Sequence, residues 1–195
     1  YEIPKRDWSS DVCSSDLQDM KAMKRYLEIL SWRTKKGKPY VIFIDNAKRQ
    51  DPECYTKLGL TSKHSNLCSE IFLHTDSEHT LSCVLSSMCG HKFDEWKDKK
   101  AVFDSIVFLD CIAQDLIVRG SQIKGLERVV RSTEKGRALG LGLLGFHSYL
   151  QQKMIPFDDL QAKFHNQIIF KHIHDEALEA SKFLADWLGE PEWCK

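Results

Sequence analysis

The sequence has no excess charge of either sign, because 28 basic side chains balance 28 acidic ones over 195 residues. A chain without a positive field, or a long run of one charge, gives no indication of nucleic-acid binding. No apolar run approaches the roughly 18 residues of a membrane-spanning helix, and no secretory signal peptide is visible. The sequence therefore predicts a cytoplasmic protein without nucleic-acid or membrane partners.

Cysteines are present, but the sequence lacks any Cys-x-x-Cys pair. An odd number of irregularly spaced cysteines argues against a secreted disulfide framework and against a zinc ribbon. We expect a reducing compartment in which most of these thiols pack as small apolar groups. The seven are Cys13, Cys54, Cys68, Cys83, Cys89, Cys111 and Cys194.

The first residues have no helical or strand period. The stretch DWSSDVCSSDL (7–17) nearly repeats SSD and resembles the conceptual translation of a sequencing-library adapter. We therefore expect residues 1–17 to be non-native and disordered, with residues 18–195 forming the domain, and Cys13 is left out of the fold prediction. A natural, disordered polar linker is the alternative.

The remaining chain carries the periodicities of an α/β protein. Apolar residues at helical spacing predict helices, and short apolar runs rich in β-branched residues predict strands. The polar segment 46–65 predicts a long irregular excursion, and RALGLGLLGFHSYLQ (137–151) a glycine-rich turn that leads into a helix. The expected helices are 18–36, 93–118, 126–130 and 158–188, and the expected strands are 39–45, 67–75 and 80–88.

Candidate chemistry lies in HSNLCSEI (64–71), where Asn66, Cys68 and Glu70 occupy alternate positions. In an extended strand these side chains share one face. If strands 67–75 and 80–88 pair through a turn between Ser77 and Glu78, Cys83 lies on that face, whereas a shift of one residue moves it to the other face. The pattern alone leaves two interpretations open: a packing cysteine, or an active site in which the Glu70 carboxylate is functional.

These residues resemble a known enzyme family. SNLCSEI followed by LSCVLSS, with GKPYVIFIDN before them and RALGLGLLGFHSYL after them, resembles the large, catalytic subunit of class I ribonucleotide reductase over residues 18–195. Vitamin-B12-dependent relatives usually have Asn-Pro-Cys-Gly-Glu here, so Leu67 and Ser69 favour class I. The resemblance implies part of a ten-stranded α/β barrel, built from two five-stranded parallel half-barrels, with Cys68 on a central finger loop and helices around it.

The resemblance also implies a role for each matching residue. Cys68 is expected to be the thiyl-radical cysteine that takes hydrogen from C3′ of the ribose, and Glu70 the general base on the 3′-hydroxyl. Asn66 is expected to hold the substrate, and Cys83 to be one half of the redox dithiol. The backbone of residues 66–70 is expected to line the substrate site: Asn66, Leu67, Cys68, Ser69 and Glu70.

The implied reaction is the reduction of ribonucleoside diphosphates to deoxyribonucleotides for DNA replication. The implied partners are a small subunit that carries a metal-generated radical, thioredoxin or glutaredoxin, and a second large subunit, with ATP and deoxynucleotide effectors bound elsewhere. No cofactor or metal is expected in this chain. The family's second redox cysteine lies upstream of this sequence, so the chain is expected to be inactive alone, and Cys89 stands where the family usually has Asn.

Two other classes of function stay open. GLGLLG (140–145) fits the G-x-G-x-x-G pattern of a nicotinamide-dependent oxidoreductase, which requires a strand before it and a helix after it. A non-catalytic helical interaction domain would leave Glu70 exposed and far from Cys83. His165, His172 and His174 lack a recognised zinc spacing, and we interpret them as solvated helix residues.

Overall fold

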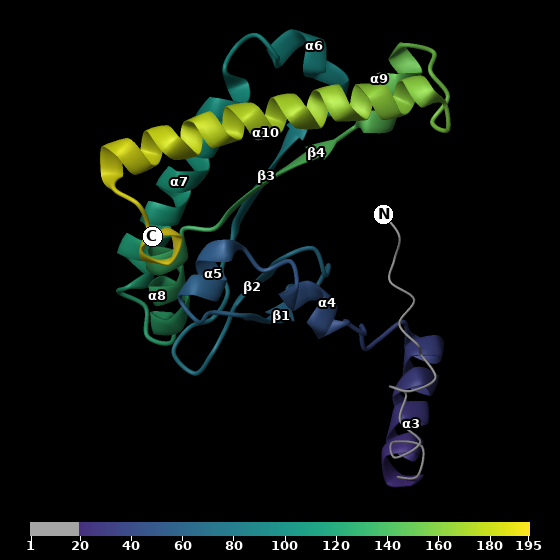
Figure 1. Ribbon diagram of the computed structural model, residues 1–195, viewed down its shortest axis with the longest axis vertical. Coiled ribbons are helices and arrows are strands. Elements are labelled where there is room, and N and C mark those ends of the chain that lie inside the picture. The colour runs from purple at the N-terminus through teal and green to yellow at the C-terminus, as the bar shows by residue number, and fades with distance from the viewer. Residues whose placement is uncertain (1–19) are drawn as a thin grey trace. The chain divides into compact units, whose positions relative to one another are not determined.

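The computed structural model describes residues 20–195, which divide into two compact units between Phe43 and Ile44. The predictions for residues 1–17 lie outside the described residues. The first unit contains helix α3 (Met20–Lys36). The second contains, in chain order, α4 (Ile44–Lys48), α5 (Glu53–Lys57), β1 (Ser62–Ser65), β2 (Phe72–His74), β3 (Val84–Cys89), the 3₁₀ helix η1 (Gly90–Lys92), α6 (Phe93–Trp96), α7 (Ala101–Gly120), α8 (Glu127–Gly136), β4 (Leu139–Leu144), α9 (Phe146–Gln152), α10 (Leu160–Leu188) and the 3₁₀ helix η2 (Glu192–Cys194) (Figure 1).

Helix α3 confirms the first predicted helix. It ends where Gly37, in the left-handed region at φ 70°, donates its N–H to the Arg33 carbonyl at 2.8 Å. The strand predicted for residues 39–45 is wrong. Residues 39–43 are irregular, Tyr40 and Phe43 are 52% and 74% exposed, and Ile44 already begins α4. An apolar segment forms a buried strand only where neighbouring strands pair with it, and no described strand pairs with residues 39–43.

The predicted irregular excursion is also wrong, because residues 46–65 include most of α4, all of α5 and strand β1. The Asp51 carboxylate fixes the start of β1: its Oδ1 accepts from the Ser62 hydroxyl at 2.6 Å, and its Oδ2 accepts from the Ser62 N–H at 3.1 Å. Strand β1 then pairs antiparallel with β2, and Ser65 faces Phe72. The strand expected over 67–75 is therefore confined to 72–74, with a different partner from the predicted one.

Strand β3 confirms the later part of the run 80–88, but it pairs in parallel with β4, from Val84 opposite Leu139 to Cys89 opposite Leu144. The predicted glycine-rich turn is thus a strand. The glycines allow close packing across this pair, since a Cβ at Gly140 would lie 2.5 Å from Leu85 Cδ2. Parallel strands joined through helices α6, α7 and α8 form a β–α–β arrangement.

The helical predictions are largely confirmed. The helix expected over 93–118 is divided into α6 and α7 by a turn at 97–100, where Lys100 adopts φ 54°. Helix α8 extends the short helix expected over 126–130 to Gly136. The long helix expected over 158–188 is α10, whose N-cap Asp159 accepts a hydrogen bond from the Gln161 N–H at 2.8 Å.

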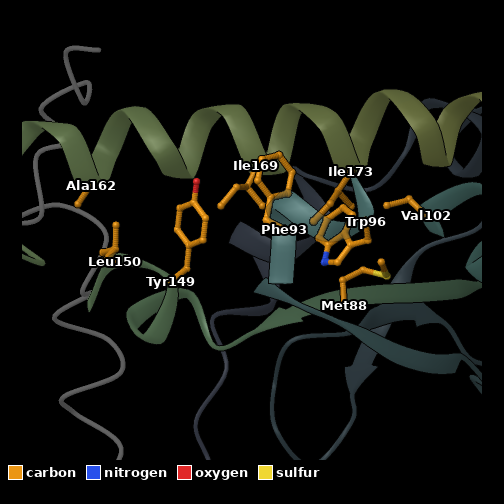
Figure 2. Packing of buried hydrophobic residues seen from close by; sticks show 9 residues of the cluster. All are labelled: Met88, Phe93, Trp96, Val102, Tyr149, Leu150, Ala162, Ile169 and Ile173. Atoms are coloured by element: carbon orange, nitrogen blue, oxygen red, sulfur yellow. The ribbon is translucent and has the colours of Figure 1, made fainter. Parts of the chain in front are cut away.

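The hydrophobic core lies between α10 and the β3–β4 pair. Figure 2 shows Ile169 and Ile173 of α10 directed toward Phe93 and Trp96, with Met88 of β3 beneath them. The Trp96 indole N–H donates to the Cys89 carbonyl at 2.9 Å, so this polar atom is satisfied inside the core. The cluster comprises Met88, Phe93, Trp96, Val102, Tyr149, Leu150, Ala162, Ile169 and Ile173.

The α/β fold class is confirmed. Within residues 20–195 the strands form two two-stranded sheets, one antiparallel and one parallel, so the described part does not close a barrel by itself. No helix in this part of the chain is long and apolar enough to span a membrane.

Candidate active site

The candidate residues lie on the turn that joins β1 to β2, rather than on an extended strand. The Asn66 N–H donates to the Ile71 carbonyl at 3.3 Å, and the Ser69 N–H donates to the Asn66 carbonyl at 3.1 Å. Ser69 is in the left-handed region at φ 65°. The prediction that alternate residues share one strand face is therefore wrong, because hydrogen bonds within 66–71 close the backbone into a turn.

The turn nevertheless brings Asn66 and Glu70 together. Asn66 Oδ1 accepts from the backbone N–H groups of Glu70 and Ile71, both at 3.2 Å. Asn66 Nδ2 donates to Glu70 Oε1 at 2.5 Å. The Asn66 amide thus both shapes the turn and orients the Glu70 carboxylate.

Cys68 lies on this turn between Asn66 and Glu70, and its side chain is exposed. Leu67 beside it is 71% exposed, while Asn66 and Ser69 are half-buried. Residues 66–70 therefore form a continuous surface with an accessible thiol, a carboxylate and backbone groups.

Cys83 directly precedes β3 and is half-buried. The pairing predicted for it is wrong, because Phe72 faces Ser65 rather than Cys83. The structure still relates Cys83 to the turn: burial, followed by the negative charge of Glu70, raises the pKa of the Cys83 thiol. Cys83 Sγ packs against Gly140 on β4, where a Cβ would lie 3.4 Å from the sulfur.

The electrostatics favour a protonated Cys83. A raised pKa keeps this sulfur as a thiol at neutral pH, whereas nucleophilic cysteines have lowered pKa values. A thiol beside a carboxylate can donate hydrogen and reducing electrons without being a strong nucleophile. The arrangement therefore suits redox chemistry better than acyl transfer.

Cys89 has a partner that the sequence analysis missed. Its sulfur lies 3.2 Å from His91 Nδ1, two residues further along the chain. The Cys-x-His spacing is the signal that could have predicted this contact. Both side chains are half-buried at the end of β3.

The helix histidines behave mostly as packing or surface residues. The His172 ring packs against Phe93 and Trp96, with centroid distances of 5.7 and 5.8 Å, so this histidine is not simply solvated. His165 Nδ1 lies 3.2 Å from the Tyr149 hydroxyl, and His174 is exposed beside Asp175. Potential metal ligands converge elsewhere in the described chain, at His74, Asp76 and His79, a group that the sequence analysis did not consider.

The dinucleotide-binding alternative does not agree with this geometry. The dinucleotide pattern needs a glycine turn between a strand and a helix, but Gly140 and Gly142 lie within β4, and only Gly145, at φ 74°, forms the turn before α9. The interaction-domain alternative required Glu70 to be exposed and remote from Cys83. Glu70 is exposed, as this alternative expects, and its negative charge, after burial, raises the pKa of the Cys83 thiol.

Comparison with known proteins decides the family. A family model described as "Ribonucleotide reductase, barrel domain" matches residues 8–193. The chain belongs to the ribonucleotide reductase family. The barrel domain named by this model agrees with the parallel β3–β4 pair and its surrounding helices.

Viral and bacterial proteins are similar to this ribonucleotide reductase chain. The ribonucleoside-diphosphate reductase large subunit of Invertebrate iridescent virus 3 is 36% identical over 178 residues, which are 91% of this chain and 28% of the viral protein. A putative large subunit from Frog virus 3 is also 36% identical, over 87% of this chain and 30% of that protein. In structure, the Actinobacillus ureae class Id ribonucleotide reductase alpha subunit matches with a TM-score of 0.81 and 39% identity, covering 92% of this chain and 35% of that subunit.

The chain spans about a third or less of the length of these relatives. The family prediction from SNLCSEI and its flanks is confirmed.

Proposed function

We propose that the chain supplies the catalytic turn, and one redox cysteine, of an enzyme that reduces ribonucleoside diphosphates to deoxyribonucleoside diphosphates. The observation that carries this proposal is the turn that presents Cys68, on which the Asn66 amide binds the Glu70 carboxylate. The negative charge of Glu70 also contributes to the raised pKa of Cys83. Membership of the ribonucleotide reductase family supports it.

Each group has a distinct task in the proposed reaction. Cys68, as a thiyl radical, takes the hydrogen atom from C3′ of the ribose. Glu70 accepts the proton of the 3′-hydroxyl, and the 2.5 Å hydrogen bond from Asn66 holds this carboxylate in place. The backbone of residues 66–70 contacts the substrate.

Cys83 supplies reducing equivalents when the 2′-hydroxyl leaves as water. Two thiols give two electrons and two protons and become a disulfide, so Cys83 needs a second cysteine, which we place outside residues 20–195. Thioredoxin or glutaredoxin would then reduce the disulfide by thiol exchange. The raised pKa of Cys83 supports this assignment, because it keeps the sulfur protonated until the substrate radical forms.

The exposure of Cys68 indicates what else the reaction requires. A radical needs protection from solvent, and the turn is open in this chain. We propose that further parts of a large subunit cover it, that a small subunit with a metal-generated radical oxidises Cys68, and that the large subunit acts as a cytoplasmic homodimer with nucleotide effectors bound elsewhere.

A chimaeric large subunit tests the proposal. Residues 20–193 of this chain replace the matching segment of the Actinobacillus ureae alpha subunit, which is assayed for deoxynucleotide formation with the subunit and reductant that this host requires. Cys68→Ser should abolish the product, and Glu70→Gln should slow its formation by about 10²–10⁴-fold, the contribution expected of a general base.

Cys111→Ser is the matched control, because this exposed cysteine lies on α7 and has no part in the proposed reaction. It should leave the rate unchanged. A Cys68→Ser chimaera that forms product at the parent rate contradicts the role of Cys68. A folded chimaera without any activity contradicts the assignment of this turn.

A further inference from the structure

The last residue of β2 and the loop that follows it bring together three side chains that the proposed reaction does not use. One ligand atom from each of His74, Asp76 and His79 lies within 4.8 Å of the other two. Both histidines are largely buried, with 7% and 14% of their side chains exposed, whereas Asp76 is 32% exposed. The two imidazoles thus lie on the buried side of the group, and the Asp76 carboxylate is accessible to solvent.

We propose that His74, Asp76 and His79 form a binding site for a zinc ion. Two imidazole nitrogens and a carboxylate oxygen are ligands that Zn²⁺ accepts, and three protein ligands leave the fourth tetrahedral position to water. The site is independent of the proposed function and carries no catalytic role.

The spacing of the ligand atoms is close to what a metal requires. His74 Nε2 lies 2.9 Å from Asp76 Oδ2, and His79 Nδ1 lies 3.0 Å from Asp76 Oδ1. With zinc–ligand bonds of about 2.0–2.1 Å, tetrahedral ligands are about 3.3 Å apart. Each imidazole nitrogen needs to move away from Asp76 by only a few tenths of an ångström, and the two imidazole nitrogens already lie within 4.8 Å of each other.

The surroundings of His74 suit a metal-bound imidazole. Its Nδ1 lies 3.0 Å from the Thr61 carbonyl and 3.2 Å from the Thr61 N–H, so this nitrogen can either donate or accept. With zinc on Nε2, Nδ1–H donates to the carbonyl, which is the outer contact typical of metal-ligating histidines. The backbone of Thr61, directly before β1, is therefore already placed to support the required tautomer.

Asp76 is prepared as an anionic ligand. Its Oδ1 accepts from the backbone N–H groups of Glu78 and His79, both at 2.7 Å. The imidazoles of His74 and His79 face the two oxygens of this carboxylate, one on each side. Trp193 closes the other side, with its ring centroid 5.5 Å from His74 and 5.1 Å from His79.

Nearby cations do not fill the site. Arg128 donates to the Asp76 backbone carbonyl, and Arg131 donates to the Glu78 carbonyl and pairs with the Glu78 carboxylate at 3.1 Å. Both guanidinium groups are thus directed at backbone or at Glu78, rather than at the Asp76 carboxylate. A zinc ion would reinforce this attachment of the β2–β3 loop, which connects the turn that carries Cys68 to Cys83.

Without metal, the same trio forms a satisfied hydrogen-bond network, because each imidazole can donate one N–H to Asp76.

Measuring zinc binding to the 195-residue chain distinguishes a metal site from a hydrogen-bond network that binds no metal. The reduced, metal-free protein is titrated with Zn²⁺ against a chromogenic chelator, and with Co²⁺ followed by visible absorption. We expect one equivalent to bind, tetrahedral Co²⁺ bands in the visible range, and a higher melting temperature with Zn²⁺.

Two variants and one control make the test specific. His79→Gln and Asp76→Asn should each weaken binding at least about tenfold and remove the rise in melting temperature. His174→Gln, which changes an exposed histidine on α10 beside Asp175, should bind like the parent. Far-UV circular dichroism identifies a variant that does not fold. The zinc affinity of the other variant then tests the proposal.

Three results overturn the proposal. The first is binding of less than a tenth of an equivalent of zinc. The second is binding that both folded variants retain at parental affinity. The third is a near-ultraviolet thiolate-to-cobalt charge-transfer band, which would show that the ion is held by the free cysteines.

Discussion

Glu70 and Cys83 interact through charge, and the interaction can be measured on the thiol. Replacing Glu70 by Gln removes the negative charge that, after burial, raises the pKa of Cys83. More of the sulfur is then thiolate at pH 8, so we expect Cys83 to be alkylated by iodoacetamide roughly two- to fivefold faster. Quantitative mass spectrometry of the Cys83 peptide over time, at several pH values, measures the rate.

Cys111 provides the internal control, since it is an exposed thiol on α7. Its rate should be the same in both proteins. A Cys83 rate that falls, or that stays constant while the fold is intact, would mean that Glu70 does not act on this sulfur.

The candidate residues could be predicted from the sequence, but their arrangement could not. Asn66, Cys68, Glu70 and Cys83 were identified by their residue types and by a family pattern. Strand parity then placed them on one face, whereas the Asn66 side chain closes a turn by accepting from two backbone N–H groups. Asn competes with strand pairing in this way, and periodicity contains no information about it.

At the scale of elements, helices α7, α8 and strand β4 are joined by one ion pair. Arg137 donates Nε and one terminal nitrogen to the two Asp110 oxygens at 2.7 and 2.8 Å, and its other terminal nitrogen to Gln114 at 2.9 Å. The Asp110 and Arg137 side chains are only 9% and 18% exposed. Asp110→Asn leaves a buried guanidinium without its counter-charge, and we expect a loss of about 3 kcal/mol in the free energy of unfolding, measured by urea denaturation.

Asp115→Asn is the matched control on the same helix, because Asp115 and its partner Arg119 are 57% and 78% exposed. Exposed pairs contribute less than about 1 kcal/mol. Equal losses in the two variants would show that Asp110 has no special part in joining these elements.

Helices were more predictable than strands for a physical reason. A helix such as α10 forms its hydrogen bonds within its own sequence, so the spacing of its apolar residues and its cap at Asp159 suffice to place it. The partner of a strand is distant in sequence: β3 pairs with β4 more than fifty positions later. Apolar run length predicts the position of β3 but neither its partner nor its direction. The glycines of β4 predict a turn, although they lie within a strand.

At the scale of the molecule, the chain exposes many large apolar side chains. On α10 alone, Leu160, Phe164 and Leu178 lie opposite the core side and are 77%, 61% and 45% exposed. The core side of the same helix is covered, as Figure 2 shows for Ile169 and Ile173, so the exposed residues form a second apolar face. The relatives are about three times as long, and in them this face has further chain available to cover it.

The last prediction concerns this second face. In solution the 195-residue chain should bind the dye ANS and self-associate with increasing concentration, because water at apolar side chains is released when they are covered. The double variant Phe164→Glu and Leu178→Glu should reduce both the ANS fluorescence and the association, with an unchanged far-UV circular dichroism spectrum. Asn166→Glu with Gln167→Glu adds the same charge at exposed polar positions and should change ANS binding much less. If sedimentation velocity shows a monomer at all concentrations and ANS stays dark, this face is not an accessible apolar surface, and the exposed side chains of α10 must be covered within the chain itself.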